Sequence, residues 1–177
     1  RYITHMKKLK DPAQALERFF APLAPLRRKL DVVLWQLPPR FDVDALPRLD
    51  AFLAALPRGV RYAVEFREPS WYLPETCAVL VAHGAAFCEH DLVPMSPPRL
   101  TGGFRYLRFH GAGAKYGGRY GPAALDPVAA DLLRTRPVVS EQLICLVSRK
   151  TQRNCTLFSD HLTWPERSRR ARPVMKT

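Results

Sequence analysis

Hydrophobic residues recur along the chain with two alternating periods, one typical of strands and the other typical of helices. The strand pattern appears in five short apolar runs, at residues 31–37, 62–66, 85–89, 104–110 and 143–147. Helices are predicted in the segments between these runs, at residues 11–23, 44–56, 74–83 and 126–134. Residues 1–10 are interpreted as the tail of a further strand that runs into a loop. This alternation predicts βα units and a parallel sheet.

A parallel sheet of this kind can close into a barrel or stay open. A complete (β/α)₈ barrel typically needs about 250 residues, and the chain has 177. We therefore expect an α/β fold built as an incomplete TIM-type barrel of about five or six strand-helix units. An open parallel sheet fits the same alternation and stays an alternative.

The predicted strand that includes residues 62–66 has two charged side chains on one face. Because side chains alternate along a strand, Glu65 and Arg67 point to one side, and Val64 and Phe66 point to the other. Burying these charges is costly unless they are paired or hydrogen-bonded. They also lie at the carboxyl end of the strand, where α/β proteins place their active sites. Two interpretations stay open: a functional site, or an internal ion pair that only stabilises the strand.

Other predicted strands have polar side chains at the same end. The residues expected at the carboxyl-terminal mouth of a barrel are Gln36, Glu65, Arg67, Arg108 and His110. We predict Glu65 and His110 as the catalytic acid and base, because a carboxylate beside cations and an imidazole can be tuned across neutral pH. Arg67 and Arg108 would hold negative charge, and Gln36 would orient the substrate. The alternative is an internal network of paired charges.

Further candidates come from strand ends and loops. His5 and Asp91 follow predicted strands, and Trp71 and Tyr116 lie on loops that can cover a ligand. We predict that these four residues bind substrate, with Asp91 suited to hold an imidazole or a sugar hydroxyl. A mouth built from such side chains fits a small polar or anionic molecule, such as a phosphate, a carboxylate or a sugar derivative.

A metal site is a weaker alternative. His5, Glu65, Asp91 and His110 have side chains that bind zinc or manganese. No local motif such as His-Glu-x-x-His joins them, so we predict no metal and leave the cofactor undefined.

The glycine-rich run at residues 111–121 is a second loop of interest. It lacks the Gly-Lys-Ser/Thr ending of a phosphate-binding loop and does not open a helix after a first strand, as a dinucleotide-binding fingerprint would. We interpret it as a lid that carries Tyr116 and Tyr120 over the mouth. A plain surface loop is the alternative.

The net charge of +12 is unevenly distributed, because half of it comes from residues 136–177, with nine Lys/Arg against three Asp/Glu. Nucleic-acid binding is therefore a second functional hypothesis, and it requires a continuous basic stripe with aromatic stacking groups. The four cysteines have neither zinc-binding nor disulfide-scaffold spacing. No apolar run is long enough to cross a bilayer, and the first residues of this sequence do not follow a signal-peptide pattern. We expect a cytoplasmic protein with reduced thiols and no membrane partner.

Five motifs occur in a characteristic order: RYITHMKKL at 1–9, LWQLPPRF at 34–41, AVEFREPSW at 63–71, Asp91, and YLRFHG at 106–111 followed by Tyr116, Gly118 and Tyr120. Together they resemble the YecE-like family (domain of unknown function 72). This resemblance implies a TIM-type barrel whose activity is unassigned. The family also has an initial Gly-Thr-Ser-Gly-Trp segment, a following Glu-Ile-Asn-x-Thr-Phe-Tyr strand and a late Tyr-Phe-Asn-Asn-Asp type motif, none of which is in this sequence.

The resemblance divides the chain into two parts. We expect residues 1–135 to be a partial YecE-like barrel domain, truncated at its N-terminus. Residues 136–177 are expected to be a divergent basic tail, either non-homologous sequence or a solvated extension. A third functional hypothesis follows, namely an inactive truncated fragment. Separately, the exposed edge strands of an incomplete barrel predict self-association.

Overall fold

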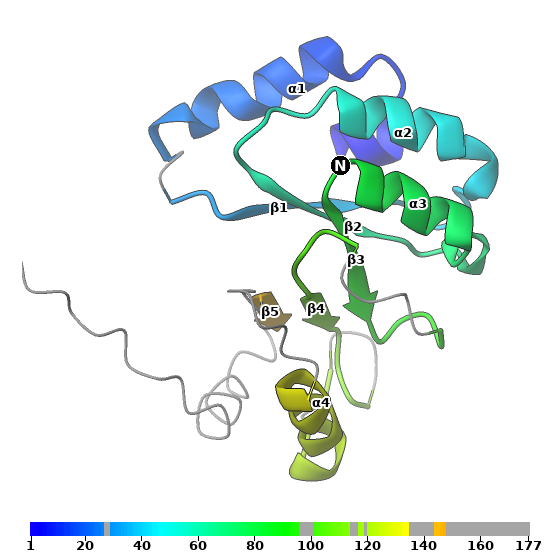
Figure 1. Cartoon of the computed structure of the whole chain (residues 1–177), viewed down its shortest axis with the longest axis vertical. Coiled ribbons are helices and arrows are strands. Elements are labelled where there is room, and N and C mark those ends of the chain that lie inside the picture. The colour runs from blue at the N-terminus through cyan, green and yellow to red at the C-terminus, as the bar shows by residue number, and fades with distance from the viewer. Residues whose placement is uncertain (27–28, 96–100, 114–116, 119, 135–143, 148–177) are drawn as a thin grey trace, which may run out of the picture.

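Five parallel strands form one sheet in a computed structural model of the chain, which describes residues 1–26, 29–95, 101–113, 117–118, 120–134 and 144–147 (Figure 1). The strands are β1 (Val32–Gln36), β2 (Arg61–Glu65), β3 (Ala85–His90), β4 (Tyr106–Phe109) and β5 (Ile144–Val147). They pair in sequence order, each parallel to the next. All five predicted strands are thus confirmed, with small differences at their ends.

The described residues include four α-helices, one before the first strand and three between strands. They are α1 (Pro12–Phe20), α2 (Leu46–Ala54), α3 (Pro74–Ala82) and α4 (Pro122–Arg134). Short 3₁₀ turns occupy Ala21–Leu26, Val43–Ala45 and Pro69–Trp71. The first three helices lie along one side of β1–β3, whereas α4 lies beside β4 and β5 (Figure 1). The predicted alternation of strands and helices is therefore confirmed.

The first residues differ from the prediction. Tyr2–Met6 form one turn of π-helix instead of the tail of a strand. The backbone N–H groups of His5 and Met6 donate to the carbonyl of Arg1, at 2.8 and 3.3 Å, and Lys7 donates to that of Tyr2. Backbone polar groups need partners, and here they find them within the segment itself.

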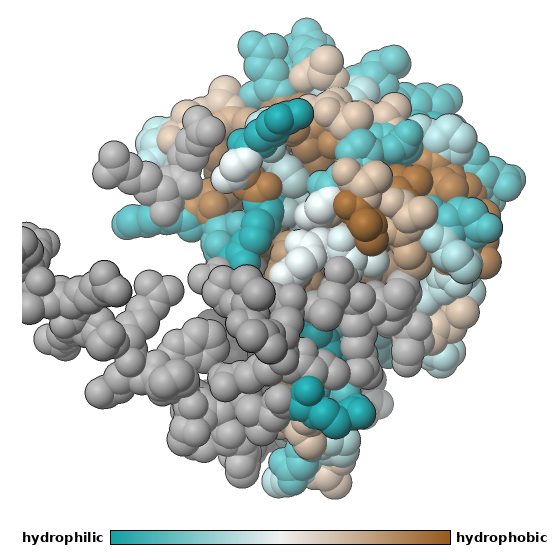
Figure 2. All heavy atoms as spheres, in the orientation of Figure 1, coloured by the Kyte–Doolittle hydropathy of each residue, from teal (hydrophilic) through white to brown (hydrophobic). Residues whose placement is uncertain are grey.

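The main hydrophobic core lies between the sheet and α1–α3. It includes Trp35 of β1, Val64 of β2, Phe87 of β3 and Leu49 of α2, all of them buried. These strand residues point to the helix-covered side, as the period-two pattern predicts. Figure 2 shows hydrophobic side chains between the helices, with hydrophilic ones mostly on the outer surface.

The 3₁₀ turn after β2 directs Trp71 into this core. Its side chain is fully buried and stacks on Phe66, with 4.9 Å between the ring centroids. Its indole N–H donates to the carbonyl of Phe41. Glu68, directly before this turn, accepts the backbone N–H of Arg40 with its carboxylate. This hydrogen bond joins the turn to the loop after β1.

The other face of the sheet is lined by smaller residues. Ala63, Ala86 and Cys88 are buried there beside Phe104 and Tyr106. Small side chains on β2 and β3 leave room above them for long side chains from the strand ends. This face is the one that holds the candidate site residues of β2 and β4.

The pairing of β3 is staggered. Its first half, Ala85–Phe87, pairs with β2, and its second half, Cys88–His90, pairs with β4. The hydroxyl of Thr101 occupies the free side of the first half, accepting the N–H of Phe87 and donating to the carbonyl of Ala85, both at 2.8 Å. Such an offset between neighbouring strands is the kind that a curled sheet requires.

A buried arginine fixes α4 against the outer face of β4. Arg105 donates to both carboxylate oxygens of Glu89, at 2.7 and 2.6 Å, and to Asp131 of α4 at 3.1 Å. The alternation along 104–110 predicts this outward direction for Arg105. The contact orients α4 relative to the sheet.

An α/β fold with a parallel sheet is confirmed. The described strands leave β1 and β5 as two edges, so the described residues do not form a closed barrel, and the number of barrel units stays a prediction. Among the helices of the described segments, none has both the length and the apolar character needed to cross a membrane.

Candidate functional site

An ion-pair network centred on Glu65 lies at the carboxyl ends of β2 and β4. Glu65 is fully buried, with 0% of its surface exposed. Its Oε1 pairs with Nε of Arg67, and its Oε2 accepts a hydrogen bond from a terminal nitrogen of Arg108. Two guanidinium groups thus compensate one carboxylate that would be costly to bury alone. The contact agrees with the shared face predicted for Glu65 and Arg67.

His110 follows β4 and is held by Asp91, which follows β3. Oδ1 of Asp91 lies 2.8 Å from Nδ1 of the His110 ring, and Oδ2 accepts the backbone N–H of His110 at 2.9 Å. Tyr120 donates its hydroxyl to the same carboxylate and accepts the N–H of Gly111 at 2.6 Å. Asp91 therefore fixes both the orientation of the ring and the path of the chain beyond β4.

The other ring nitrogen of His110 faces the Glu65 network. Because Nδ1 donates to the carboxylate, Nε2 of the neutral ring is an acceptor. A terminal nitrogen of Arg67 lies 3.4 Å from this Nε2, and Oε1 of Glu65 lies 3.9 Å from it. Residues that are far apart in sequence thus form one continuous set of contacts, the strand-end network: Glu65, Arg67, Asp91, Arg108, His110 and Tyr120.

A cavity of about 500 Å³ lies beside β1. Three predicted site residues, His5, Gln36 and Arg108, are among those that line it. His5 comes from the first helical turn, and its Nδ1 lies 2.9 Å from the hydroxyl oxygen of Thr4. The cavity therefore adjoins the strand-end network through Arg108.

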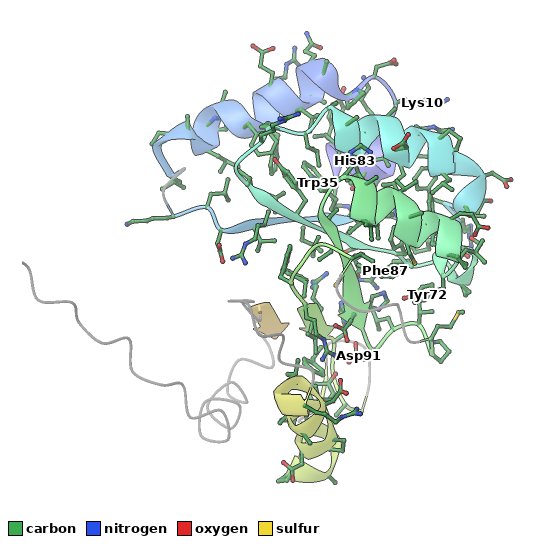
Figure 3. The ribbon with its side chains drawn as sticks, in the orientation of Figure 1. Lys10, Trp35, Tyr72, His83, Phe87 and Asp91 are labelled. Carbon is green, nitrogen blue, oxygen red and sulfur yellow. The ribbon has the colours of Figure 1, made fainter. Side chains whose placement is uncertain are left out.

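A second cavity of about 490 Å³ lies between β4 and α4. Its lining includes Asp91, the neighbouring His90, and Arg108. Arg108 therefore contacts both cavities, and 23% of its side chain is exposed. Asp91 lies next to α4, whereas Trp35, which lines the first cavity, lies beneath α1 (Figure 3).

The hydrogen bonds to Asp91 keep its carboxylate ionised. Partial burial by itself would raise the pKa of Asp91, but hydrogen bonds from the His110 ring, the Tyr120 hydroxyl and the His110 backbone outweigh it and lower the pKa to about 2. Conversely, burial and then the hydrogen bond to Asp91 raise the pKa of Tyr120 to about 12. At neutral pH the pair is a carboxylate that accepts and a phenol that donates.

Acid should weaken this part of the fold. The pKa of Asp91 falls from 3.8 to about 2 on folding, so its contribution is complete above about pH 4 and is lost as the pH falls toward 2. Since 28% of its side chain is exposed, we expect a contribution of about 1 kcal/mol, below the full linkage value. Urea unfolding of the wild type and Asp91→Asn should therefore give free energies that differ by about 1 kcal/mol less at pH 2 than at pH 5. A difference that does not change with pH would contradict this role.

Two predicted substrate-binding residues are not part of this arrangement. Trp71 lies in the hydrophobic core and lines neither of the two cavities described above. Tyr116 lies outside the described residues, so its predicted position over the mouth stays a prediction.

Two other residues join the site without having been proposed as its members. Tyr120, expected only on a lid, donates to Asp91. His90 packs its ring 5.9 Å from that of His110 and places Nε2 2.7 Å from the carbonyl of Phe66. Burial lowers the pKa of His90. Its position directly before Asp91, at the end of a predicted strand, was a signal that could have identified it.

The described residues can be searched for a metal site, but they do not test the predicted partners. Within the described ranges no group of three or more His, Cys, Asp and Glu side chains converges as a metal site would require. Nucleic-acid binding and self-association through sheet edges stay predictions, and most of the basic segment 136–177 lies outside the described residues.

Comparison with known proteins identifies a family and two solved structures that match most of the chain. The family described as "Protein of unknown function DUF72" matches residues 1–173, a range that includes most of the segment 136–177, whose separate origin stays a prediction. No curated protein matches the chain.

Two solved structures are similar to this fold. A DUF72 family protein from Thermotoga maritima MSB8 is 28% identical with a TM-score of 0.75, and the similarity covers 92% of this chain and 71% of that one. A DUF72 family protein from Enterococcus faecalis V583 is 18% identical with a TM-score of 0.68, and the similarity covers 85% of this chain and 68% of that one. At this identity, the similarity supports the fold alone. The chain belongs to the DUF72 family, which confirms the resemblance to YecE-like proteins.

Proposed function

We propose that the strand-end network is the acid–base centre of an enzyme acting on a small polar or anionic molecule. The observation that carries this proposal is the 2.8 Å contact between Asp91 and Nδ1 of His110. It fixes the ring so that Nε2 is left as the acceptor, the arrangement by which a carboxylate prepares an imidazole for general base catalysis. His110 is therefore the proposed catalytic residue.

The geometry supports a different role for Glu65 from the one expected. Both of its oxygens face guanidinium groups, and none of its surface is exposed. A carboxylate held in this way is poorly suited to exchange protons. We assign Glu65 as a positioning residue that holds Arg67 and Arg108 in place, and we assign the two arginines to the negative charge of the substrate.

Access to His110 depends on the arginines. The ring is 1% exposed, and Arg67 lies 3.4 Å from its Nε2. A proton can reach Nε2 only when Arg67 gives up this contact. A substrate with a negative charge offers Arg67 an alternative partner, so substrate binding and exposure of the base would be coupled.

The test compares matched histidine variants on a pool of small phosphorylated, carboxylated and sugar compounds, with consumption followed by mass spectrometry. His110→Gln should reduce turnover of any consumed compound by about 100-fold or more. His83→Gln is the control, because His83 pairs with Asp50 at 2.6 Å away from the network. Turnover that survives in His110→Gln, with the variant folded, would overturn the proposal, as would the absence of turnover in the wild type.

A further inference from the structure

We infer that the cavity beside β1 binds an organic anion with a flat apolar body, its charged group lying against Arg108. This inference rests on the proposed function, because it names the class of substrate that the strand-end network would receive. The cavity of about 500 Å³ is large enough for a molecule of one or two rings.

The charge of the cavity lining favours an anion. Arg1, Arg18 and Arg108 line it, and no Asp or Glu is among the described residues that do. Within the network, one terminal nitrogen of Arg108 is hydrogen-bonded to Glu65. A guanidinium group has five N–H donors in a planar fork, so Arg108 can hold Glu65 and a second carboxylate or phosphate together.

The remaining polar side chains of the lining are neutral. Burial, and then the charge of Arg1, lowers the pKa of His5, so its ring is uncharged at neutral pH. The contact with Thr4, 2.9 Å from Nδ1, fixes the direction of this ring. With Gln36 on the same cavity wall, these groups supply hydrogen bonds for orientation without adding charge.

The apolar part of the lining favours a flat body. Phe19 of α1 and Trp35 of β1 both line the cavity, and their ring centroids are 5.1 Å apart with the planes inclined by 51°. Phe19 remains 37% exposed, so its ring still has surface that a ligand can cover. Aromatic rings of this kind gain from offset or edge-to-face contact with another ring. A ligand with both a ring and an anionic group would use both halves of the cavity.

Calorimetric titration with four probes tests the inference: 2-naphthoate, phenyl phosphate, inorganic phosphate and uncharged 2-naphthamide. We expect 2-naphthoate or phenyl phosphate to bind in a saturable one-to-one manner, at least 10-fold more tightly than 2-naphthamide and inorganic phosphate. The tighter of the two aromatic anions identifies the preferred charged group, carboxylate or phosphate.

Three arginine variants locate the site. Arg18→Gln, which changes an exposed side chain, should weaken binding of the preferred probe 3- to 10-fold. Arg108→Gln should weaken it more than 10-fold if the variant folds. Arg58→Gln is the control, since Arg58 lines other cavities, and it should leave the affinity unchanged.

Several results would overturn the inference. They are the absence of saturable binding, equal affinity for 2-naphthoate and 2-naphthamide, or equal effects of Arg18→Gln and Arg58→Gln. Failure here is distinguishable from failure of the proposed function, because His110→Gln should still bind the preferred probe. Turnover that depends on His110 without binding of either aromatic anion would contradict this inference alone.

Discussion

Replacing Glu65 by glutamine is expected to lower the free energy of unfolding by about 3–5 kcal/mol. The carboxylate is fully buried and forms ion pairs with both Arg67 and Arg108. Without its charge, two guanidinium groups remain close together, and Arg67 has only 8% of its side chain in water. Urea unfolding at pH 7, followed by circular dichroism, measures the change.

The exposed pair of Arg61 and Asp31 provides the control. Their side chains are 29% and 58% exposed, so Asp31→Asn should cost no more than about 1 kcal/mol. If Glu65→Gln and Asp31→Asn had similar effects, burial of the strand-end network would not govern its energy. A folded Glu65→Gln protein would also allow the proposed role of Glu65 to be tested, since loss of a positioning residue should weaken anion binding.

Trp71→Ala should destabilise the protein by a comparable amount, about 3–5 kcal/mol. The variant removes a fully buried ring that stacks on Phe66. The ring centroid of Trp71 lies 4.9 Å from that of Phe66 and 5.9 Å from that of Phe41. It also leaves the carbonyl of Phe41 without the indole N–H. The same unfolding measurement applies, with the midpoint and the slope fitted separately.

Two companion variants separate the causes. Trp71→Phe keeps most of the ring and removes the hydrogen bond, so it should cost about 1–3 kcal/mol. Leu73→Ala, two residues away at a position 41% exposed, should stay within about 0.5 kcal/mol. A Trp71→Ala protein of unchanged stability would return Trp71 to the role expected from sequence, a ligand-covering side chain on a loop.

The placement of the charged strand residues could be predicted because backbone geometry imposes it. Alternation by two along a strand leaves Glu65 no choice of face once Val64 and Phe66 are buried against the helices. The same rule separates Arg108, which points to the network, from Arg105, which points to α4. Where periodicity fixes direction, a single sequence was enough.

In loops and turns, no such periodicity predicts the direction of a side chain. Trp71 was expected on a ligand-covering loop because connecting segments usually run over the surface, yet a 3₁₀ turn directs its ring into the core. Tyr120 donates a hydrogen bond to Asp91, 29 positions earlier in the sequence. Tyr120 lies in a glycine-rich run that has no regular hydrophobic period, so the sequence does not predict where its side chain points. Residues 1–10 were expected to be the tail of a strand, but Tyr2–Met6 form a helical turn with local hydrogen bonds instead.

The salt bridge between Glu65 and Arg108 passes over β3, since the two residues belong to strands on either side of it. Cys88 lies beneath this bridge, with its sulfur 3.9 Å from Oε2 of Glu65. A larger side chain at position 88 would separate the two charges without touching the backbone. During divergence of the family, positions 65, 88 and 108 are therefore expected to change as a set: a bulky residue at 88 becomes acceptable only where the charged pair has already been lost.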